Sequence, residues 1–579
     1  MLVPGRELTA PAATGVPDGS LARIGARLRA PWLAGGLLAL ALGVAYLIVA
    51  PPSGDLAAAT YRADLFARSG FTIWDNGWYG GHDLLAYSLL APPLGALLGV
   101  RTLLATSGVI ASMLFGGLAA RAFVRPGAAL AASLLFALGY SAELSSGRVP
   151  YDAGVAVALA SLWAFLWALE RPPPGRLLPA LALASIACTT SPVAGFFLAL
   201  AAVATALAGM GRVHEGRRPQ IVRGGLALAV AALAPLLVLA VAFPEGGREP
   251  FAAGAFWPEL LGALAFAAFL PRGAMPERAW RALRLGAAIY ALALLTAYLL
   301  SSPLGGNAVR LGALFGPPLV LGSLWGAEGI EVLGRTLSWR TVAMALAPVL
   351  LYWQLATAID DQLALAGDPS VHASYYAPLR GELARLAGGA PLRVEVPMTD
   401  AHWESAYLPG GEISLARGWE RQLDTRYDGL FYRAGLTAAG YRAWLQQNAI
   451  SYVALPRLRL EAAGREEAGL IRAGLPFLHE VWRAADWRLF AVEGAAPLAA
   501  APARMTALGG EDFALALPRG GSYRVAVRYS PYWAIVAGTG CVREAPGGWT
   551  LLSAPGAGRL RVAIRFSLAR IFDHGPRCR

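Results

Sequence analysis

Long apolar runs recur along the chain from residue 31 to residue 356, separated by short polar stretches. Most of them approach the roughly 20 residues that an α-helix needs to cross the hydrocarbon core of a bilayer. The runs lie at 32–50, 84–100, 103–120, 126–141, 153–169, 177–210, 224–243, 252–270, 285–300, 311–327 and 341–357. This pattern predicts a polytopic α-helical membrane protein.

Run 177–210 is too long for a single crossing. Its middle, Thr189-Thr190-Ser191-Pro192, has the composition of a turn, and arginines flank the run on both sides. Because basic flanks favour the cytoplasm, both ends of the run belong on the same side, which requires an even number of crossings. We therefore expect two helices with the turn outside.

Run 84–100 is short and contains Pro92-Pro93. If this run lies in the membrane interface and does not span, 18 arginines fall in cytoplasmic segments, against six in outward segments before residue 340. The positive-inside rule favours that arrangement. It gives eleven spans with the N-terminus inside. The outward segments are then 51–102, 142–152, the turn near 190, 244–251, 301–310 and everything after 357.

The soluble parts of the chain surround this membrane region. Residues 1–30 are polar and lead into the first apolar run with no small-residue cleavage site, so we expect a cytoplasmic segment and no cleavable signal. After Asp360, charges, Trp and Tyr become frequent. Strand patterns at 393–396, 451–455 and 487–492, with helical patterns at 376–388, 436–448 and 465–474, predict an α/β domain over 358–497. Short strands between Gly and Pro turns predict a β-sandwich over 498–579.

The amino-acid composition agrees with this architecture and indicates which partners the protein binds. The chain is 56% hydrophobic and only 15% charged. Its net charge of +12 lies mostly in short loops between apolar runs, where it sets topology. We therefore exclude nucleic acid as a partner and expect the lipid bilayer of the cell membrane. Cys541 and Cys578 lie in the predicted outward tail, where they either pair or remain free thiols.

The first predicted outward loop, 51–102, has the most unusual composition of any segment of the chain. It opens with Gly54-Asp55, carries a second acid at Asp64, and continues through aromatic residues and glycines to His82. Nine residues on a helix are two and a half turns, so Asp55 and Asp64 point to opposite sides and form no obvious dyad. A single carboxylate at a membrane surface can still act as a general base or hold a divalent cation. The alternative is a pair of solvated loop acids.

This loop resembles that of the C-type glycosyltransferase (GT-C) superfamily, especially its large bacterial membrane branch, with the pattern GD…(Y/H)RA..LF..G…W…(W/Y)GG…PPL. The matching residues are Gly54, Asp55, Tyr61, Arg62, Ala63, Leu65, Phe66, Gly70, Trp74, Trp78, Tyr79, Gly80, Gly81, Pro92, Pro93 and Leu94. The resemblance extends in outline over 31–356 and the outward C-terminal part. It implies a GT-C-like fold and transfer of a sugar from a polyprenyl-phosphate donor to a glycan or glycolipid acceptor.

By position, the resemblance assigns Asp55 as the catalytic base or metal-associated acid, with Asp64 second. A divalent cation, Mg²⁺ or Mn²⁺, is the cofactor that Asp55 would hold. Many relatives have two adjacent acids here, whereas this chain has Asp55-Leu56. That departure leaves both base catalysis and metal use open, and it favours a second hypothesis, a non-catalytic relative that binds or assembles envelope polysaccharide.

The leaving group of such a donor is a phosphate, which calls for a cation. Arg310, next to Asn307 at the start of the tenth span, is the first choice, with Arg148 and Arg248 as further candidates. An arginine at this position is equally well explained if its side chain extends to the membrane interface and binds no ligand. Arg62 and His82 are additional candidates for phosphate binding, although a lone His is more often a plain hydrogen-bonding residue.

Aromatic residues offer places for a sugar ring to stack. Trp74, Trp78 and Tyr79 serve either this purpose or an interfacial aromatic belt. In the tail, His402-Trp403-Glu404 suits either carbohydrate binding or docking onto the membrane domain. A transporter is a third hypothesis, but the spans contain few ionisable residues and no clear inverted repeat.

Overall fold

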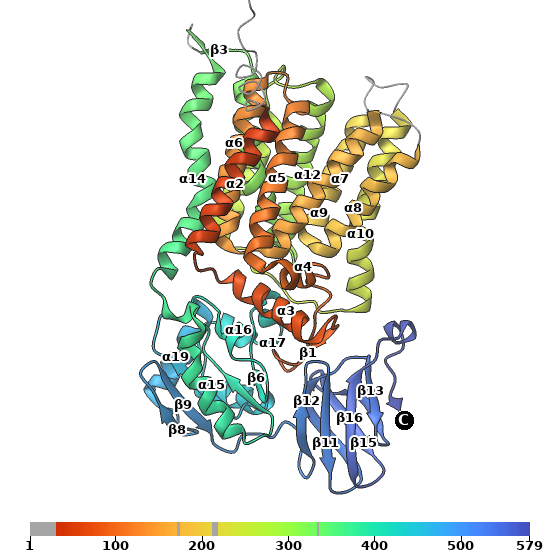
Figure 1. Cartoon of the computed structure of the whole chain (residues 1–579), viewed down its shortest axis with the longest axis vertical. Helices are drawn as coiled ribbons and strands as arrows, with labels where there is room; N and C mark the ends of the chain where they lie inside the picture. Colours follow the sequence, from red (N-terminus) through yellow and green to blue (C-terminus); the bar gives the residue numbers. More distant parts are fainter. Residues whose placement is uncertain (1–29, 171–173, 211–217, 333–334) are drawn as a thin grey trace, which may run out of the picture.

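The structure is a computed structural model that describes residues 30–170, 174–210, 218–332 and 335–579. A bundle of long helices forms one half, and a soluble tail covers one end of it (Figure 1). The predicted N-terminal segment 1–30 lies almost wholly outside the described residues.

The bundle helices follow the apolar runs closely. They are α2 (Pro31–Val49), α5 (Val100–Ala122), α6 (Pro126–Ser146), α7 (Val149–Glu170), α8 (Leu178–Thr190), α9 (Pro192–Gly209), α10 (Arg218–Ala242), α11 (Ala253–Phe269), α12 (Glu277–Leu299), α13 (Arg310–Gly326) and α14 (Trp339–Leu365). In the described part of the chain, nine helices are long and apolar enough to cross a membrane, and two shorter apolar helices correspond to α8 and α11. The chain therefore has the architecture of a polytopic α-helical membrane protein.

Small residues let these helices approach closely. A side chain at Gly116 of α5 would lie 2.6 Å from the Pro31 carbonyl oxygen of α2. A Cβ at Gly35 of α2 would come within 2.3 Å of the Ser133 hydroxyl on α6. Within a bilayer, such close backbone approach provides the van der Waals contact that holds helices together.

The two ambiguous runs behave as the sequence predicts. Run 177–210 breaks between α8 and α9, where Ser191 caps α9 by accepting a hydrogen bond from the Ala194 amide at 3.4 Å. Run 84–100 contains only the eight-residue helix α4 (Ala91–Leu98), about 12 Å long, which is too short to cross a bilayer. Gly99, with φ of 81°, separates α4 from α5.

Several helices are longer than their apolar runs, which the sequence did not indicate. Helix α12 begins at Glu277, eight residues before run 285–300, and its first turn carries an ion pair between Glu277 and Arg281 at 2.6 Å. Helix α14 continues to Leu365, eight residues past run 341–357. Polar turns at the ends of helices need no apolar surroundings, so hydropathy alone underestimates helix length.

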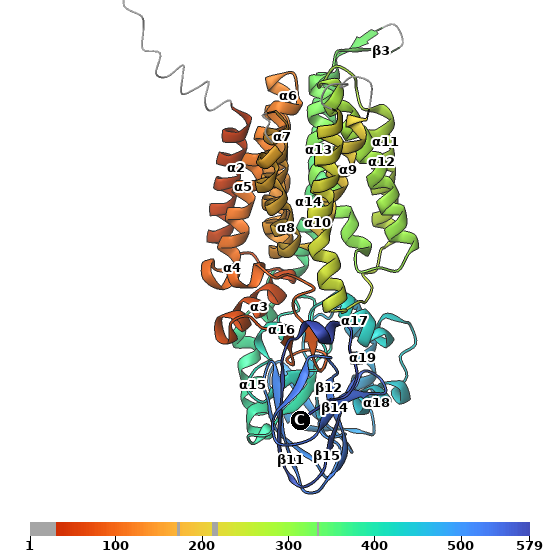
Figure 2. The same ribbon diagram turned by 90° about the vertical axis from the view of Figure 1, so that its right-hand side faces the viewer.

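The first loop and the tail lie at the same end of the bundle (Figures 1 and 2). The loop folds into α3 (Asp55–Ser69) and the short hairpin β1 (Trp74–Asp75) and β2 (His82–Asp83). Loops at the opposite end are tied together by hydrogen bonds from Arg125 Nη1 to the Ala327 carbonyl at 3.1 Å and from the Val124 amide to the Ala274 carbonyl at 3.0 Å. A small hairpin, β3 (Ile330–Val332) and β4 (Arg335–Leu337), also lies there.

The first half of the tail is an α/β unit. Its five-stranded sheet has the order β6 (Ile413–Leu415), β5 (Leu392–Glu395), β7 (Tyr452–Pro456), β9 (Trp487–Val492) and β8 (Leu478–Arg483). Strand β5 pairs in parallel with β6 and β7, whereas β9 runs antiparallel to β7 and β8. The accompanying helices are α15 (Ala373–Ala387), α16 (Glu404–Tyr407), α17 (Arg421–Tyr427), α18 (Ala438–Gln447) and α19 (Ala462–Ala473).

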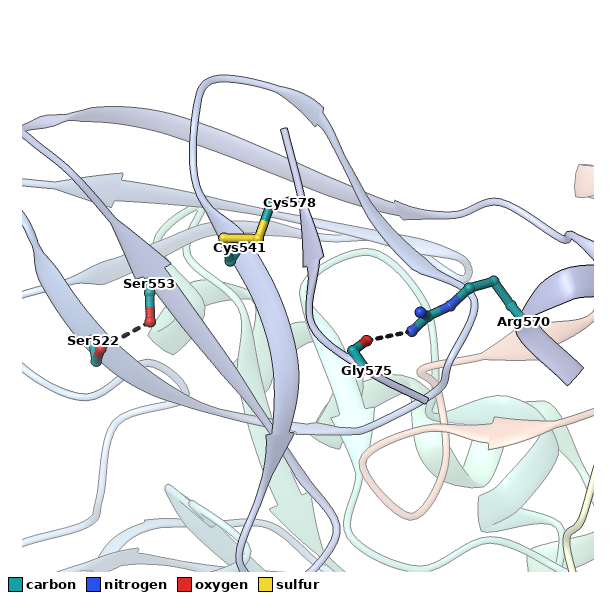
Figure 3. Close-up of a disulfide and its surroundings, with 6 residues drawn as sticks. All are labelled: Ser522, Cys541, Ser553, Arg570, Gly575 and Cys578. Atoms are coloured by element: carbon teal, nitrogen blue, oxygen red, sulfur yellow. Dashed lines mark hydrogen bonds between the residues drawn. A yellow bond between two sulfur atoms is a disulfide. The ribbon is translucent and has the colours of Figure 1, made fainter. Parts of the chain in front are cut away.

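The second half of the tail is a β-sandwich. One sheet has the order β10 (Arg504–Leu508), β11 (Asp512–Leu517), β16 (Gly558–Ile564) and β13 (Trp533–Ala537). The other has the order β12 (Gly521–Arg528), β15 (Trp549–Ala554), β14 (Cys541–Ala545) and β17 (Arg577–Cys578). A disulfide joins Cys541 to Cys578 across the β14–β17 pair (Figure 3).

Candidate functional site

The candidate site lies where the loops at one end of the bundle meet the tail. Asp55 is the first residue of α3, so its carboxylate sits at the positive end of the helix dipole. Its side chain is 36% exposed, which leaves the carboxylate accessible to a ligand. Asp64 lies on the opposite side of α3 and is exposed. Its charge acts on Tyr407 of the tail, so Asp64 takes no part in the Asp55 site.

Arg148 is the charged partner of Asp55. Its Nε lies 3.3 Å from Asp55 Oδ2, and its Nη1 lies 3.6 Å from Glu143 Oε2. Burial lowers the pKa of Arg148, but the charges of Glu143, Asp55, Asp152 and Asp361 outweigh burial and raise it above its ordinary value. Arg148 therefore stays a cation, and it forms an ion pair with the Asp55 carboxylate.

A close turn places Arg148 there. Gly147 ends α6 with φ of 74°, a left-handed conformation that favours glycine. A side chain at this position would lie 2.5 Å from the Ser53 hydroxyl, so glycine also permits the close approach of the first loop. The Ser53 hydroxyl donates to the Ser146 carbonyl, which fixes the start of α3 against the end of α6.

Asp152, one turn after Arg148 on α7, is fully buried. Its backbone amide donates to the Arg148 carbonyl at 3.1 Å, whereas neither side-chain oxygen has a hydrogen-bond partner among the described residues. The charge of Asp152 is one of those that act on Arg148. Arg148 is thus surrounded by carboxylates from three elements of the bundle end.

Arg310 begins α13 at the same end of the bundle. Its guanidinium carbon lies 5.3 Å from the ring centre of Tyr151, and Tyr151 donates to the Arg310 carbonyl at 3.4 Å. In the described parts of the chain no carboxylate oxygen lies within 4.0 Å of its guanidinium nitrogens. Asn307 precedes it in the short helix η3 (Gly305–Val309) and is half-buried. Arg310 can therefore accept an anionic ligand without first breaking an ion pair.

The pKa values of two side chains, Glu249 and Tyr87, depend on the charges of both Asp55 and Arg310. The pKa of Glu249 is raised to about 7, because burial outweighs the opposing charges of Arg421, Arg310 and Arg148, while Asp55 also raises it. Burial also raises the pKa of the Tyr87 hydroxyl, where Arg310 and Asp55 again act with opposite signs. Asp55, Arg148 and Arg310 therefore share one neighbourhood, which Glu249 and Tyr87 border.

An open pocket of about 480 Å³ adjoins this neighbourhood on the tail side. Its lining includes Glu249, Arg421, Phe431, Tyr432, Glu461 and Glu466. Arg421 Nη1 donates to the Tyr432 hydroxyl and to Glu461 Oε1, each at 3.0 Å. Aromatic faces beside fixed charged groups suit a sugar, because rings cover its apolar face while charges bind its hydroxyls.

Arg62 does not have the environment expected of a phosphate-binding residue. It is 4% exposed and pairs with Glu420 of the tail, and its guanidinium lies 4.0 Å from the ring centre of Tyr87. The pair connects α3 with the start of α17, so Arg62 holds the tail on the loop. Arg248 is exposed, and only its backbone groups bond to Thr425.

The aromatic residues of the first loop are buried. Trp78 is fully buried, stacks on Tyr61 at 4.4 Å, and donates from its indole to the Ser405 carbonyl at 3.0 Å. Tyr79 is 1% exposed and bonds to the backbone of Glu420. Trp74 packs edge-on against Trp533 of the sandwich. None of these rings has a free face for a sugar, and together they pack the tail onto the loop.

His82 is also buried, between Trp78 and Tyr79. Burial, together with the nearby Arg62 charge, lowers the pKa of its imidazole to about 3. His82 is therefore neutral at physiological pH and carries no charge that would bind phosphate.

The tail cluster His402-Trp403-Glu404 belongs to the same contact. Trp403 donates from its indole to the Ser53 carbonyl at 3.1 Å, and His402 stacks on Trp419 at 3.4 Å. Glu404 accepts hydrogen bonds from the amide and hydroxyl of Thr399. Of the two interpretations of this cluster, the contacts favour docking onto the membrane domain.

A divalent cation does not fit the residues around Asp55. In the part of the chain that the structure describes, no three His, Cys, Asp or Glu side chains gather closely enough to hold a metal ion. Arg148 already occupies the position beside Asp55 and Glu143 that a cation would need. We therefore derive no chemical step through a metal at this site.

Sequence reasoning missed four of the groups that shape the site: Glu143, Asp152, Glu249 and Tyr87. A signal for the first two existed, because Glu143, Arg148 and Asp152 are the charged residues of a short outward turn between two apolar helices. Charges in so short a connection have little room to separate. Nothing in the sequence indicates that Glu249 and Arg421 line one pocket.

Comparison with known proteins adds little to this geometry. No protein-family model and no curated protein matches the chain. A solved structure of the arabinofuranosyltransferase AftD from Mycobacteria matches with 16% sequence identity and a TM-score of 0.47. The match covers 85% of this chain but only 40% of that one. A similarity at this level does not define an activity, so function must be inferred from the site.

Proposed function

We propose that the chain is a membrane glycosyltransferase of the GT-C type. It would transfer a sugar from a polyprenyl-phosphate donor to a glycan or glycolipid acceptor at the outer face of the cell membrane. The observation that carries this proposal is the accessible Asp55–Arg148 pair at the tail-covered end of the bundle, with Arg310 nearby.

The chemistry follows from these groups. Asp55 takes the proton from the acceptor hydroxyl as that oxygen forms a bond to the anomeric carbon. The bond from this carbon to the phosphate oxygen breaks, and its electron pair stays on the phosphate. The lipid phosphate thus gains a negative charge as Asp55 loses its own. Arg310, the first residue of α13, stabilises that charge as a planar donor suited to phosphate.

In this mechanism Arg148 is the positively charged partner of the Asp55 carboxylate. The ion pairs with Asp55 and Glu143 keep the guanidinium in place. The 480 Å³ pocket would hold the acceptor, since Glu249 borders both the pocket and the neighbourhood of Asp55.

Asp55→Asn tests the proposal, with Asp64→Asn as a matched control on the opposite side of the same helix. Both proteins are reconstituted with a panel of labelled polyprenyl-phosphate sugars, and incorporation of label into envelope acceptor is measured. Loss of a general base predicts a decrease of about 10²–10⁴-fold for Asp55→Asn and little change for Asp64→Asn. Undiminished incorporation by Asp55→Asn with an unchanged melting temperature contradicts the assignment.

The alternative function is a non-catalytic protein that binds or assembles envelope polysaccharide. Leu56 stands where many relatives have a second acid, and Asp55 is already held by Arg148. This alternative predicts that the unmodified protein binds polysaccharide but incorporates no label from any donor in the panel.

A further inference from the structure

The β-sandwich has an unusual concentration of exposed apolar side chains. Phe566 is 49% exposed, Leu568 is 72% exposed and Phe572 is 83% exposed. These three residues, which we call the apolar patch, are all the exposed large hydrophobic side chains of residues 498–579, a range the structure describes completely. Three such side chains within seven residues mark an interaction surface, whereas isolated ones are ordinary.

The apolar patch lies beside the end of a membrane helix. The Phe566 ring centre is 6.0 Å from that of Phe243 and 5.1 Å from that of Tyr532. The Tyr532 hydroxyl donates to the carbonyl of Ala242, the last residue of α10, at 2.6 Å. In both views the dark blue C-terminal segment lies close to this end of α10 (Figures 1 and 2).

The depth of this position follows from helix length. Helix α10 has 25 residues and is about 37 Å long, compared with about 30 Å for the hydrocarbon core. The helix is thus long enough for its Ala242 end to reach the headgroup region. On the last turns of α10, Leu237, Val238 and Val241 are exposed and face the surroundings of the bundle. The apolar patch continues this lipid-facing surface onto the tail.

The segment that carries the apolar patch is held in place. The nearly buried Arg570 donates to the carbonyls of Pro531 at 2.9 Å and Gly575 at 2.8 Å, and it pairs with Asp573 at 3.1 Å. The disulfide between Cys541 and Cys578 closes the far end of the segment (Figure 3). Exposed rings on a fixed segment lose little conformational freedom on binding, which favours association.

We propose that the apolar patch inserts into the outer surface of the bilayer, at the boundary between headgroups and acyl chains. The adjoining Arg565 is exposed and would remain among the headgroups, as is usual for residues that flank an inserted apolar face. The insertion gives the sandwich a second attachment to the membrane, besides its contact with α10. It does not depend on glycosyl transfer.

Spin labels test this directly. Leu568→Cys and Phe572→Cys are labelled in the full chain, reconstituted in phosphatidylcholine nanodiscs, and compared with Val481→Cys, an exposed position on β8. Cys188 is buried and the other two cysteines are bonded, so the added cysteine takes the label. Labels on the patch should be more accessible to oxygen and less accessible to a polar nickel chelate than the Val481 label.

Water-like accessibility at both patch positions overturns the proposal. So does dipolar broadening between labels, which would indicate a second copy of the chain on the patch. A second variant covers the case in which labelling disturbs the fold. Leu568→Asp combined with Phe572→Asp should accelerate hydrogen exchange in 565–573 within nanodiscs, whereas Val481→Asp should not. Unchanged exchange in the double variant also counts against insertion.

Discussion

Nε of Arg148 lies 3.3 Å from Oδ2 of Asp55, although 93 residues separate the two in the chain. Asp55 begins α3 in the loop after α2, and Arg148 lies in the turn between α6 and α7. This pairing defines the candidate site, because it gives the carboxylate a counter-ion and holds it in position.

Replacement of Arg148 by Met should reduce glycosyl transfer by about 10²–10³-fold, the range seen when one preorganised electrostatic partner is lost. Asp55 would lose its counter-ion, and Glu143 and Asp152 would repel it. The measurement is label incorporation as a function of donor concentration. Arg148→Lys should recover part of the rate. The control is Arg248→Met, whose exposed side chain makes no contact that the structure records, and which should keep near-normal activity.

Replacement of Trp78 by Ala should weaken the attachment of the tail to the membrane domain. Removal of a fully buried Trp from a packed contact costs about 3–5 kcal/mol, and the hydrogen bond to Ser405 is lost as well. Thermal unfolding in nanodiscs and limited proteolysis of the tail measure the effect. Trp257→Ala, at a ring 54% exposed on α11, should change little. Equal effects of the two substitutions would contradict the packing role of Trp78.

Glu404 should make the docked tail more stable under mildly acidic conditions. Burial raises the pKa of its carboxyl from 4.5 to about 7, so the folded protein keeps a proton that the unfolded chain releases near pH 4.5. The resulting stabilisation is complete below about pH 4.5 and is lost as the pH rises through 7. Between pH 5 and pH 7 the melting temperature of Glu404→Gln should therefore depend less on pH than that of the unmodified protein.

The control for this prediction is Glu544→Gln, an exposed carboxylate on β14. Its pH profile should follow that of the unmodified protein, which also contains the other buried acids. A Glu404→Gln profile parallel to both would show that Glu404 does not titrate in this range.

The sidedness of the chain can be checked with a membrane-impermeant thiol reagent. Arg272→Cys and Arg519→Cys are both at exposed positions. Arg272 lies in the loop between α11 and α12, which contacts Val124 at the end of the bundle away from the tail, and Arg519 lies between β11 and β12 of the sandwich. In intact cells the reagent should label position 519 and spare position 272 until the membrane is opened. Labelling of both positions, or of 272 alone, would contradict the outward placement of the tail.

The helical membrane fold could be predicted from the sequence because each membrane helix depends on residues that are close together in the chain. A bilayer forces each crossing to satisfy its own backbone hydrogen bonds, so length and apolarity of a run suffice to predict a helix. The break at Ser191-Pro192 was predicted from the length of run 177–210 and its basic flanks, and the helix α4 in run 84–100 is short, as the distribution of arginine had suggested. The tail strands β5, β7 and β9 likewise followed from alternation of apolar and polar positions.

The candidate site was predicted only in part. The sequence pointed to Asp55, Arg148 and Arg310, because charges are rare and conspicuous beside apolar runs. For His82, Trp78 and Tyr79 it left open a choice between ligand contacts and an ordinary hydrogen-bonding or interfacial role, and the structure buries all three beneath the tail. The composition of an aromatic, glycine-rich loop is the same whether its rings contact a sugar or another part of the protein.

The sequence by itself therefore determined the membrane helices, the uneven distribution of arginine and the limits of the loops between helices, since each depends on residues close together in the chain. Only the tertiary structure decided that Arg148 pairs with Asp55, that Arg62 pairs with Glu420, and that Glu249 borders the pocket. Those contacts join segments separated by 93 residues or more, and packing of the tail against the bundle sets which of them form. No local pattern carries that information.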